Sequence, residues 1–163
     1  MAKAYKYVIY EKAGNIARLT FNKPEKLNSL GIIGMEADWK EVMDAFPKAE
    51  EDDEVKVIIL RGAGRGFCTG EDLTRVGVVY GMKPGGRRAS ERIRLKMDRE
   101  AFESIQKIFL SPKITIAQIH GYAIEGGLFI SMCCDFAIAA RDARMGFPAQ
   151  RLGFAGGGSL DLD

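Results

Sequence analysis

The sequence predicts an α/β fold with a largely parallel sheet. Three apolar runs, VKVIILRG, KITIAQIHG and DFAIAAR, have the composition of buried strands. Segments with helical periodicity separate these runs along the chain. Strands that alternate with helices favour layered α/β packing with parallel strand pairs. We therefore expect a single α/β domain over residues 1–163.

The N-terminal part begins with two β-rich runs. YKYVIYEKAG and IARLTFNKP flank a Gly-Asn turn, which predicts a β-hairpin. In the stretch LNSLGIIGMEADWKEVMDAF that follows, apolar residues recur at roughly helical intervals, which predicts a helix. These residues are Ile33, Ala37, Val42 and Phe46. We expect the acidic run KAEEDDEV to be a solvated linker into the strand VKVIILRG.

The middle of the chain contains a glycine-rich loop and a long charged helix. GAGRGFCTGEDL follows the first buried strand, and we expect the next segment, TRVGVVYGMKPGGRR, to be mobile. ASERIRLKMDREAFESIQKIFL predicts a helix that Pro112 ends. Its expected apolar face consists of Ile93, Met97, Phe102, Ile105 and Phe109. After the strand KITIAQIHG, the run GGLFISMCC predicts a short helix that begins at its glycines.

Composition excludes several classes of protein. Hydrophobic residues make up 47% and charged residues 28%, which is typical of a globular soluble domain. A net charge of +2 gives no argument for nucleic acid or a membrane surface, and no apolar run has membrane-spanning length. Cys68, Cys133 and Cys134 form neither a disulfide framework nor a zinc motif. We expect reduced thiols in a cytoplasmic protein without a metal site.

Two segments share the same order of strand, glycine loop and helix-like run. They are VIILRGAGRGFCTGEDL and ITIAQIHGYAIEGGLFIS. A helix start presents free backbone N–H groups, so two starts that face one point would form an oxyanion hole. Tight strand–helix packing would also explain Gly126 and Gly127, and this alternative remains open. A dinucleotide fingerprint fails because Phe67 stands where its third glycine belongs, and no P-loop motif occurs.

Four segments resemble, in order and spacing, signatures of the crotonase superfamily of enoyl-CoA hydratases and isomerases. They are NKPEKLNSL, GFCTGEDL, SPKITIAQIHGYAIEGGL and CDFAIAARDARMGFP, and the resemblance spans nearly the whole chain. It implies a crotonase-like spiral of ββα units that binds an acyl-CoA thioester. It also implies that the backbone N–H groups of Glu71 and Gly126 form the oxyanion hole.

The resemblance further implies a set of residues that contact the acyl-CoA substrate. Lys26, Leu27 and Asn28 belong to a stretch that resembles the segment along the CoA moiety. The other expected contacts are Cys68, Gly70, Asp72, Leu73, Tyr122, Gly127, Phe129, Pro148 and Ala149. Coenzyme A is expected as part of the substrate, with no permanently bound cofactor. The implied assembly is a homotrimer or a dimer of trimers.

The sequence departs from the family at both catalytic carboxylates of the hydratases. Phe129 and Ala149 stand where those enzymes have glutamates, and neither side chain accepts a proton. Glu125 is a candidate base in their place, but we expect it to cap a helix start or point to solvent. Other titratable candidates are Glu71 and Asp72 as acidic residues at a helix start, His120 as a structural residue, a Tyr122 phenol, Arg151 at the surface, and Asp161 and Asp163 near the end.

Two functional hypotheses follow from this pattern. One is an enzyme of fatty acid metabolism that acts on an acyl-CoA thioester by isomerase, decarboxylase, dehalogenase or hydrolase chemistry. The alternative is a non-catalytic CoA-binding or scaffold protein. Family members continue through further helices that roof the acyl pocket and build the trimer. Because the printed sequence stops soon after MGFPAQRLGF, we expect it to represent the N-terminal core of such a protein. An RNA-binding role is not supported, since the chain lacks a basic stripe.

Overall fold

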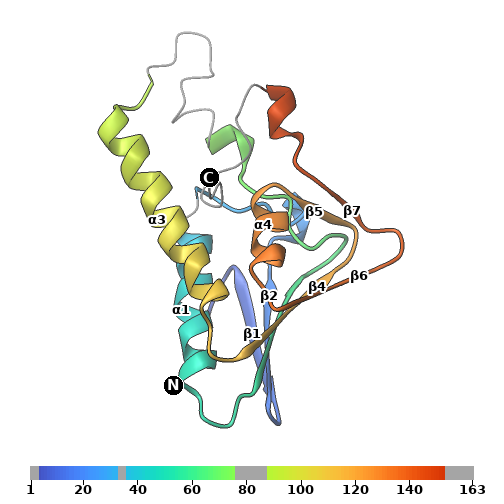
Figure 1. Ribbon diagram of the computed structural model, residues 1–163. Coiled ribbons are helices and arrows are strands. Elements are labelled where there is room, and N and C mark those ends of the chain that lie inside the picture. Colours follow the sequence, from blue (N-terminus) through green and yellow to red (C-terminus); the bar gives the residue numbers. More distant parts are fainter. Residues whose placement is uncertain (1–3, 33–35, 76–87, 153–163) are drawn as a thin grey trace.

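The computed structural model describes residues 4–32, 36–75 and 88–152 (Figure 1). The main sheet has five strands in the order β1-β2-β3-β4-β6, and a second sheet pairs β5 with β7. The strands are β1 (Val8–Ala13), β2 (Ile16–Phe21), β3 (Val57–Gly62), β4 (Ile114–Ile119), β5 (Tyr122–Ile124), β6 (Phe136–Ala139) and β7 (Arg144–Gly146). The helices are η1 (Pro24–Lys26), α1 (Ala37–Glu51), α3 (Glu91–Phe109), α4 (Gly126–Met132) and η2 (Pro148–Leu152).

Strand pairing follows the predicted pattern. β1 and β2 form an antiparallel hairpin that closes at the pair Ala13–Ile16, and this confirms the predicted turn. The pairs β2–β3, β3–β4 and β4–β6 are all parallel, as is β5–β7. Parallel strands end at the same edge of a sheet, so the loops after β3 and β4 leave the sheet as neighbours.

Helix α1 begins and ends later in the chain than the sequence predicts. The expected helix over residues 27–46 is wrong at its start, because Leu27 and Asn28 have φ angles of 51° and 56°, which no α-helix accommodates. The predicted linker KAEEDDEV is wrong in its first half. Residues 48–51 continue α1, since Ala49 extends the buried face of Val42 and Phe46. Ala37 is exposed, and Ile33 lies outside the described residues.

The hydrophobic core joins the main sheet to α1 and α3. Its largest fully buried side chains include Trp39 and Phe46 of α1 and Phe67 of the loop after β3. The Phe67 ring contacts Phe21 edge-on, with ring centroids 5.5 Å apart. This contact anchors the glycine-rich loop to the end of β2, so the loop belongs to the core rather than to the mobile surface.

Helix α3 confirms the predicted element but not all of its apolar face. Met97 and Ile105 are buried, whereas Ile93 and Phe109 are exposed and Ile108 takes the inner position instead. The spacing of residues 97, 105 and 108 marks the one stripe that contacts the core. Most of the segment predicted to be mobile, residues 74–88, lies outside the described residues.

Two strand predictions need correction. β3 and β4 alternate between buried residues and residues with more exposure, so they are not covered on both faces. All four residues of β6 are exposed, which makes the prediction of a third buried strand wrong. Among the described residues β6 is last in the sheet order and pairs only with β4, so a continuous apolar run here marks an edge strand.

The described residues contain neither a membrane-spanning helix nor a metal-binding cluster. No described helix is both long and apolar enough to cross a bilayer. No group of three or more histidine, cysteine, aspartate or glutamate side chains there is arranged to hold a metal ion.

Candidate functional site

The loop after β3 lies alongside β5 and pairs with it through an isolated bridge between Cys68 and Ala123. The backbone N–H of Phe67 donates to the His120 carbonyl at 2.9 Å, and that of Cys68 donates to Tyr122 at 3.0 Å. In return, the N–H of Ile124 donates to the Cys68 carbonyl at 3.0 Å. These bonds fix the register between two segments that lie far apart in the sequence. They bring the ends of both glycine loops to one place.

Glycine is required where the two loops meet. A Cβ atom at Gly127 would lie 2.2 Å from the Cys68 carbonyl oxygen, and one at Gly70 would lie 2.9 Å from the Gly126 nitrogen. Real Cβ atoms do not approach other atoms so closely, so both positions exclude a side chain. Tight packing against the first loop therefore explains the glycine at position 127. It also explains how the residues after Gly70 and Glu125 become neighbours.

The Glu71 carboxylate lies against Gly126. Its oxygen atoms lie beside the backbone of Gly126, at the point where the two loops meet. A Cβ atom at Gly126 would lie 3.0 Å from Glu71 Oε2. Burial and the negative charge of Glu125 raise the pKa of the Glu71 carboxyl above its ordinary value, while the backbone N–H groups of Glu71 and Gly126 oppose this shift. An anionic group of the first loop thus lies against the second loop at Gly126.

Glu125 directs its side chain away from α4. Its carboxylate accepts a 2.5 Å hydrogen bond from the Ala149 N–H of η2, and its own N–H donates to Gly146 at 3.1 Å. It makes no side-chain hydrogen bond to the start of α4, so the expectation of a helix cap is wrong. The residue is only partly exposed, so the expectation that it points to solvent is wrong as well.

Of the two positions where the resemblance expects hydratase glutamates, Ala149 contacts the Glu125 side chain and Phe129 packs elsewhere. Ala149 holds Glu125 through its backbone, as described above. Phe129 is half-buried and packs on Phe147, with ring centroids 4.6 Å apart and a 39° angle between the rings. Phe129 thus contributes an aromatic ring at one of these positions, and Ala149 contributes a methyl group at the other. Glu125 and Glu71 supply the carboxylates of this region.

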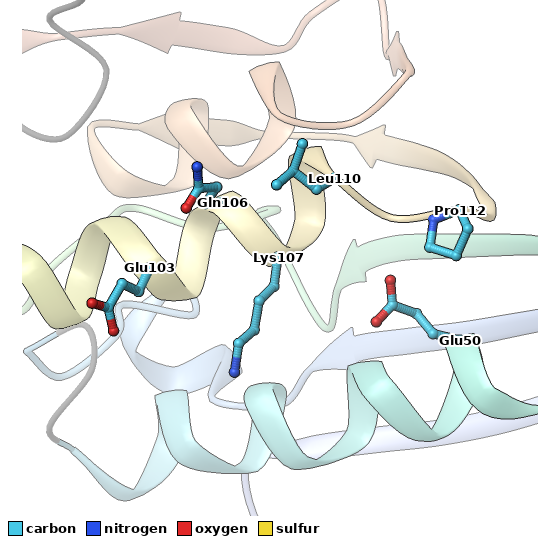
Figure 2. A pocket seen from close by; sticks show the side chains of 6 residues that line it. All are labelled: Glu50, Glu103, Gln106, Lys107, Leu110 and Pro112. Atoms are coloured by element: carbon cyan, nitrogen blue, oxygen red, sulfur yellow. The ribbon is translucent and has the colours of Figure 1, made fainter.

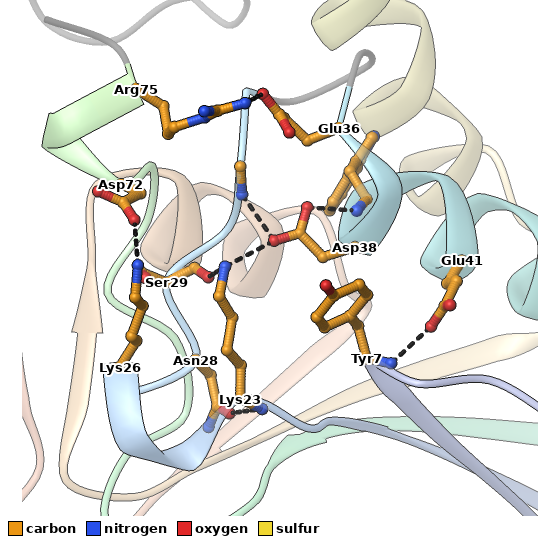
Figure 3. A network of polar contacts seen from close by, with 12 residues as sticks. Tyr7, Lys23, Lys26, Asn28, Ser29, Glu36, Asp38, Glu41, Asp72 and Arg75 are labelled. Carbon is orange, nitrogen blue, oxygen red and sulfur yellow. Dashed lines mark hydrogen bonds and ion pairs between the residues drawn. The ribbon is translucent and has the colours of Figure 1, made fainter.

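The expected CoA segment is fastened to the first glycine loop (Figure 3). Lys26 and Asp72 form an ion pair at 2.9 Å, and Thr74 and Lys26 together hold the pKa of Asp72 at about 2. Asn28 is almost fully buried and binds Lys23, Ala63 and Gly66. Its Oδ1 accepts from the Lys23 N–H, and its Nδ2 donates to both loop carbonyls, each at 2.8 Å. Asn28 therefore has a structural role beyond the expected CoA contact.

A buried ion pair beside this segment was not predicted. Lys23 Nζ contacts Asp38 Oδ2 at 2.8 Å and the Ser29 carbonyl at 3.0 Å (Figure 3). The Gly31 N–H also donates to Asp38 Oδ2 at 2.8 Å. Asp38 thus ties the start of α1 to the segment that holds Leu30 beside Glu71. The only sequence signal is a single aspartate among the apolar positions of the predicted helix.

The remaining predicted site residues fall into different environments. Leu73 and Pro148 are exposed, and Leu27 and Tyr122 are partly buried. The guanidinium of Arg144 lies 5.9 Å from the centre of the Tyr122 ring. Asp161 and Asp163 lie outside the described residues.

The single histidine and the cysteines have structural surroundings. His120 Nε2 forms a 2.9 Å hydrogen bond with the Gly64 carbonyl, which joins the two loops once more. Burial raises the pKa of the Cys68 thiol to about 12, so this thiol stays protonated at neutral pH. The Cys133 and Cys134 thiols have pKa values raised by burial to about 11 and about 12. Arg151 is exposed on η2.

A hollow of about 480 Å³ lies elsewhere, between α1, α3 and the segment after α3 (Figure 2). It is lined by Glu50, Glu103, Gln106, Lys107, Leu110 and Pro112. None of the predicted site residues lines it. Charged surface side chains of both signs dominate its walls, so it offers no acyl site.

Comparisons with known proteins give consistent results. A family model described as "Enoyl-CoA hydratase/isomerase" matches residues 11–161. The chain is 34% identical over 154 residues to a short-chain-enoyl-CoA hydratase of Clostridium acetobutylicum, covering 92% of this chain and 52% of that protein. It is 31% identical over 159 residues to a crotonyl-CoA hydratase of Syntrophomonas wolfei, covering 94% and 54%. The chain thus spans about half the length of these relatives.

Solved structures agree with the fold. A probable enoyl-CoA hydratase of Mycobacterium smegmatis superposes with a TM-score of 0.76 at 32% identity, covering 92% of this chain and 55% of that one. An enoyl-CoA hydratase/carnitine racemase of Magnetospirillum magneticum gives a TM-score of 0.80 at 24% identity, with 93% and 53% covered. The predicted crotonase-like α/β fold is confirmed. Because the family model also covers nearly all of the sequence, the chain belongs to the enoyl-CoA hydratase/isomerase family.

Proposed function

We propose that the protein binds an acyl-CoA thioester and stabilises a negatively charged oxygen with the backbone N–H groups of Glu71 and Gly126. The observation that supports this proposal is that the two glycine loops meet with the Glu71 carboxylate lying against Gly126. The carboxylate oxygen occupies the kind of position that a thioester oxygen would take. Family membership supports acyl-CoA as the substrate class.

This geometry suits reactions in which charge develops on the thioester oxygen. Removing a proton beside the carbonyl gives an enolate, and adding a nucleophile to the carbonyl gives a tetrahedral oxyanion. Fixed donors stabilise such a charge without reorganising, and losing one donor costs on the order of 3 kcal/mol in comparable sites. Coenzyme A enters as part of the substrate, so no permanently bound cofactor is needed.

The reaction differs from two-glutamate hydration. Phe129 and Ala149 offer no proton acceptor, so isomerisation, decarboxylation, dehalogenation or thioester hydrolysis are the candidate reactions. The assembly would be a homotrimer or dimer of trimers in the cytoplasm, where it would serve fatty acid metabolism. A second candidate is a CoA-binding scaffold without turnover, and the loss of both carboxylates favours it.

Ligand binding tests the shared part of both candidates. Butyryl-CoA and S-butyl-CoA, a thioether that lacks the carbonyl oxygen, are titrated into the protein by calorimetry. We expect saturable binding of butyryl-CoA, with shifts of the Glu71 and Gly126 amide resonances in NMR spectra that the thioether does not reproduce. If butyryl-CoA does not bind, or if neither amide responds to the carbonyl, the proposed site is wrong.

Turnover separates the enzyme from the scaffold. The protein is incubated with 2-enoyl-, 3-enoyl-, malonyl-, halogenated and saturated acyl-CoA compounds, and the products are separated by chromatography. A product that forms in proportion to protein concentration identifies an enzyme and its reaction class. Tight binding without any product supports the scaffold.

A further inference from the structure

The Glu71 side chain fills the place that the proposed function reserves for substrate. We infer that the Glu71 carboxylate is an internal ligand of the site between Glu71 and Gly126, which a thioester oxygen has to displace, so that this side chain determines the affinity for acyl-CoA. The inference rests on the proposed function and deepens it, because it assigns to the side chain a role separate from that of its backbone.

The available space requires displacement rather than shared occupancy. Built on Gly126, a Cβ atom would lie 3.0 Å from Oε2 of Glu71 and 3.3 Å from both Oε1 and Cδ. The whole carboxylate group therefore covers the face of Gly126. A thioester oxygen bound to the same two N–H groups would need to lie about 3 Å from each nitrogen. It would overlap the carboxylate oxygen that is already there.

The backbone of Glu71 is held independently of its side chain. Leu30 pairs with the chain on both sides of Glu71: its N–H donates to the Gly70 carbonyl at 2.8 Å, and its carbonyl accepts from the Asp72 N–H at 2.7 Å. Asp72 is held further by its ion pair with Lys26. The side chain of Glu71 can therefore rotate away while its N–H group stays in place for the substrate.

The electrostatic surroundings make the carboxylate a displaceable ligand. In the part of the chain that the structure describes, no ion pair involves Glu71 or Glu125. A partly enclosed carboxylate without a cation is costly, and the charge of Glu125 adds to that cost. Burial and like charge thus both oppose the ionised carboxylate in this place, which favours its displacement. The apparent affinity for substrate is therefore the intrinsic affinity multiplied by the fraction of molecules in which the site is free.

Removing the side chain while keeping the backbone donor tests this directly. Butyryl-CoA and S-butyl-CoA are titrated into the wild-type chain and into Glu71→Ala. If the site is free in roughly one molecule in ten, Glu71→Ala should bind butyryl-CoA about tenfold more tightly. The affinity for S-butyl-CoA should change by less than about threefold, because the thioether has no oxygen to place between the donors.

Two further variants make the test specific. Glu25→Ala removes a negative charge from an exposed residue beside the expected CoA segment, and both affinities should stay within about twofold of wild type. Glu71→Gln keeps the shape and one acceptor oxygen but loses the charge, so its gain should be smaller than that of Glu71→Ala and again confined to the thioester. This second variant also serves if Glu71→Ala does not fold.

The outcomes are distinct. An unchanged or weaker affinity of both Glu71 variants for butyryl-CoA would overturn the inference and leave the proposed function intact. An equal gain for both ligands would assign the effect to charge repulsion of CoA and would also overturn it. If neither ligand binds to any of the proteins, the proposed function fails and the inference with it.

Discussion

The two loops that meet at the candidate site differ in which residue takes a positive φ angle. In the first loop Gly70 has a φ angle of 73°, and the next residue, Glu71, has the proposed donor N–H and a side chain. In the second loop Glu125 has a φ angle of 45°, and the next residue, Gly126, has the other proposed donor N–H and no side chain. Glu71 and Gly126 thus each follow a residue with a positive φ angle, a conformation that glycine adopts more readily than other residues.

This difference shows where each loop is constrained. The turn at Gly70 is unstrained, whereas a non-glycine residue in such a region costs about 1–3 kcal/mol. The contacts of Glu125 with Ala149 and Gly146 hold it there. The bare Gly126 leaves room that the Glu71 carboxylate occupies. The second loop therefore provides the space, and the first loop provides the group that fills it.

Catalysis of water addition gives the largest expected effect, because it depends on the carboxylates that the second loop and η2 do not carry. We predict crotonyl-CoA hydration slower by about 10²–10⁴-fold for each missing acid–base group. The loss of enoyl absorbance is followed with the short-chain-enoyl-CoA hydratase of Clostridium acetobutylicum as the control. Hydration at a rate comparable to that of the control would show that another group, such as Glu125, has replaced the missing pair.

Disrupting the contact between the two loops should give the next largest effect, a loss of stability. Gly127→Ala places a methyl group 2.2 Å from the Cys68 carbonyl oxygen, which is backbone and cannot rotate away. We expect the free energy of unfolding to fall by about 3 kcal/mol or more, measured by urea denaturation. Gly146→Ala is the matched control, since nothing lies within 4 Å of its added Cβ. Equal stability of the two variants would mean that the loops are not packed as described.

The titration of Glu71 should give a smaller effect with a definite sign. Its pKa is raised in the folded protein by burial first and by Glu125 second. In the window above the ordinary value of 4.5, the folded state therefore binds more protons than the unfolded chain, and the free energy of unfolding decreases as pH rises. Glu71→Gln should lose this slope. The same slope in both proteins would assign it to other groups.

Asp72, the next residue along the chain, should show the opposite pH dependence of stability in the same experiment. Thr74 and Lys26 lower its pKa to about 2, so its contribution is present above the ordinary value of 3.8 and is lost as pH falls toward 2. Asp72→Asn should therefore weaken the acid side of the profile and leave the window above 4.5 unchanged. A loss of slope above 4.5 in this variant would contradict the assignment to Glu71.

The fold could be predicted where local pattern and tertiary packing agree. The hairpin, the parallel strands and α3 follow from apolar periodicity and turn residues. The start of α1 could not be predicted, because Leu27 and Asn28 take left-handed conformations that favourable helical spacing does not reveal. β6 has the composition of a buried strand, and only the sheet order shows that it lies at an edge.

The candidate site also has some features that the sequence predicts and others that it does not. The repeated order of strand, glycine loop and helix predicted that the two glycine loops are related, and the structure brings them together. The side-chain directions of Glu71 and Glu125 could not be predicted, since they depend on contacts between segments more than 20 residues apart in sequence, such as Ala149 with Glu125. The pairing of Lys23 with Asp38 depends on a similar long-range approach.

The smallest expected effect concerns the strained residue of the second loop. Glu125→Gln keeps an oxygen that can accept the Ala149 N–H, so we expect it to cost less than about 1 kcal/mol of the free energy of unfolding. Glu125→Ala removes that acceptor and should cost more, about 1–3 kcal/mol if the Ala149 N–H finds no water. Urea denaturation of both variants measures the difference.

Turnover of Glu125→Gln decides whether the strain serves catalysis. We expect the rate with whichever acyl-CoA the wild type consumes to be unchanged, because the Ala149 backbone N–H engages the carboxylate. A base must reach the proton that it removes, and the amide that replaces it cannot accept one. A loss of a hundredfold or more at unchanged affinity would therefore identify Glu125 as the base and would explain why a glutamate, rather than glycine, occupies the turn.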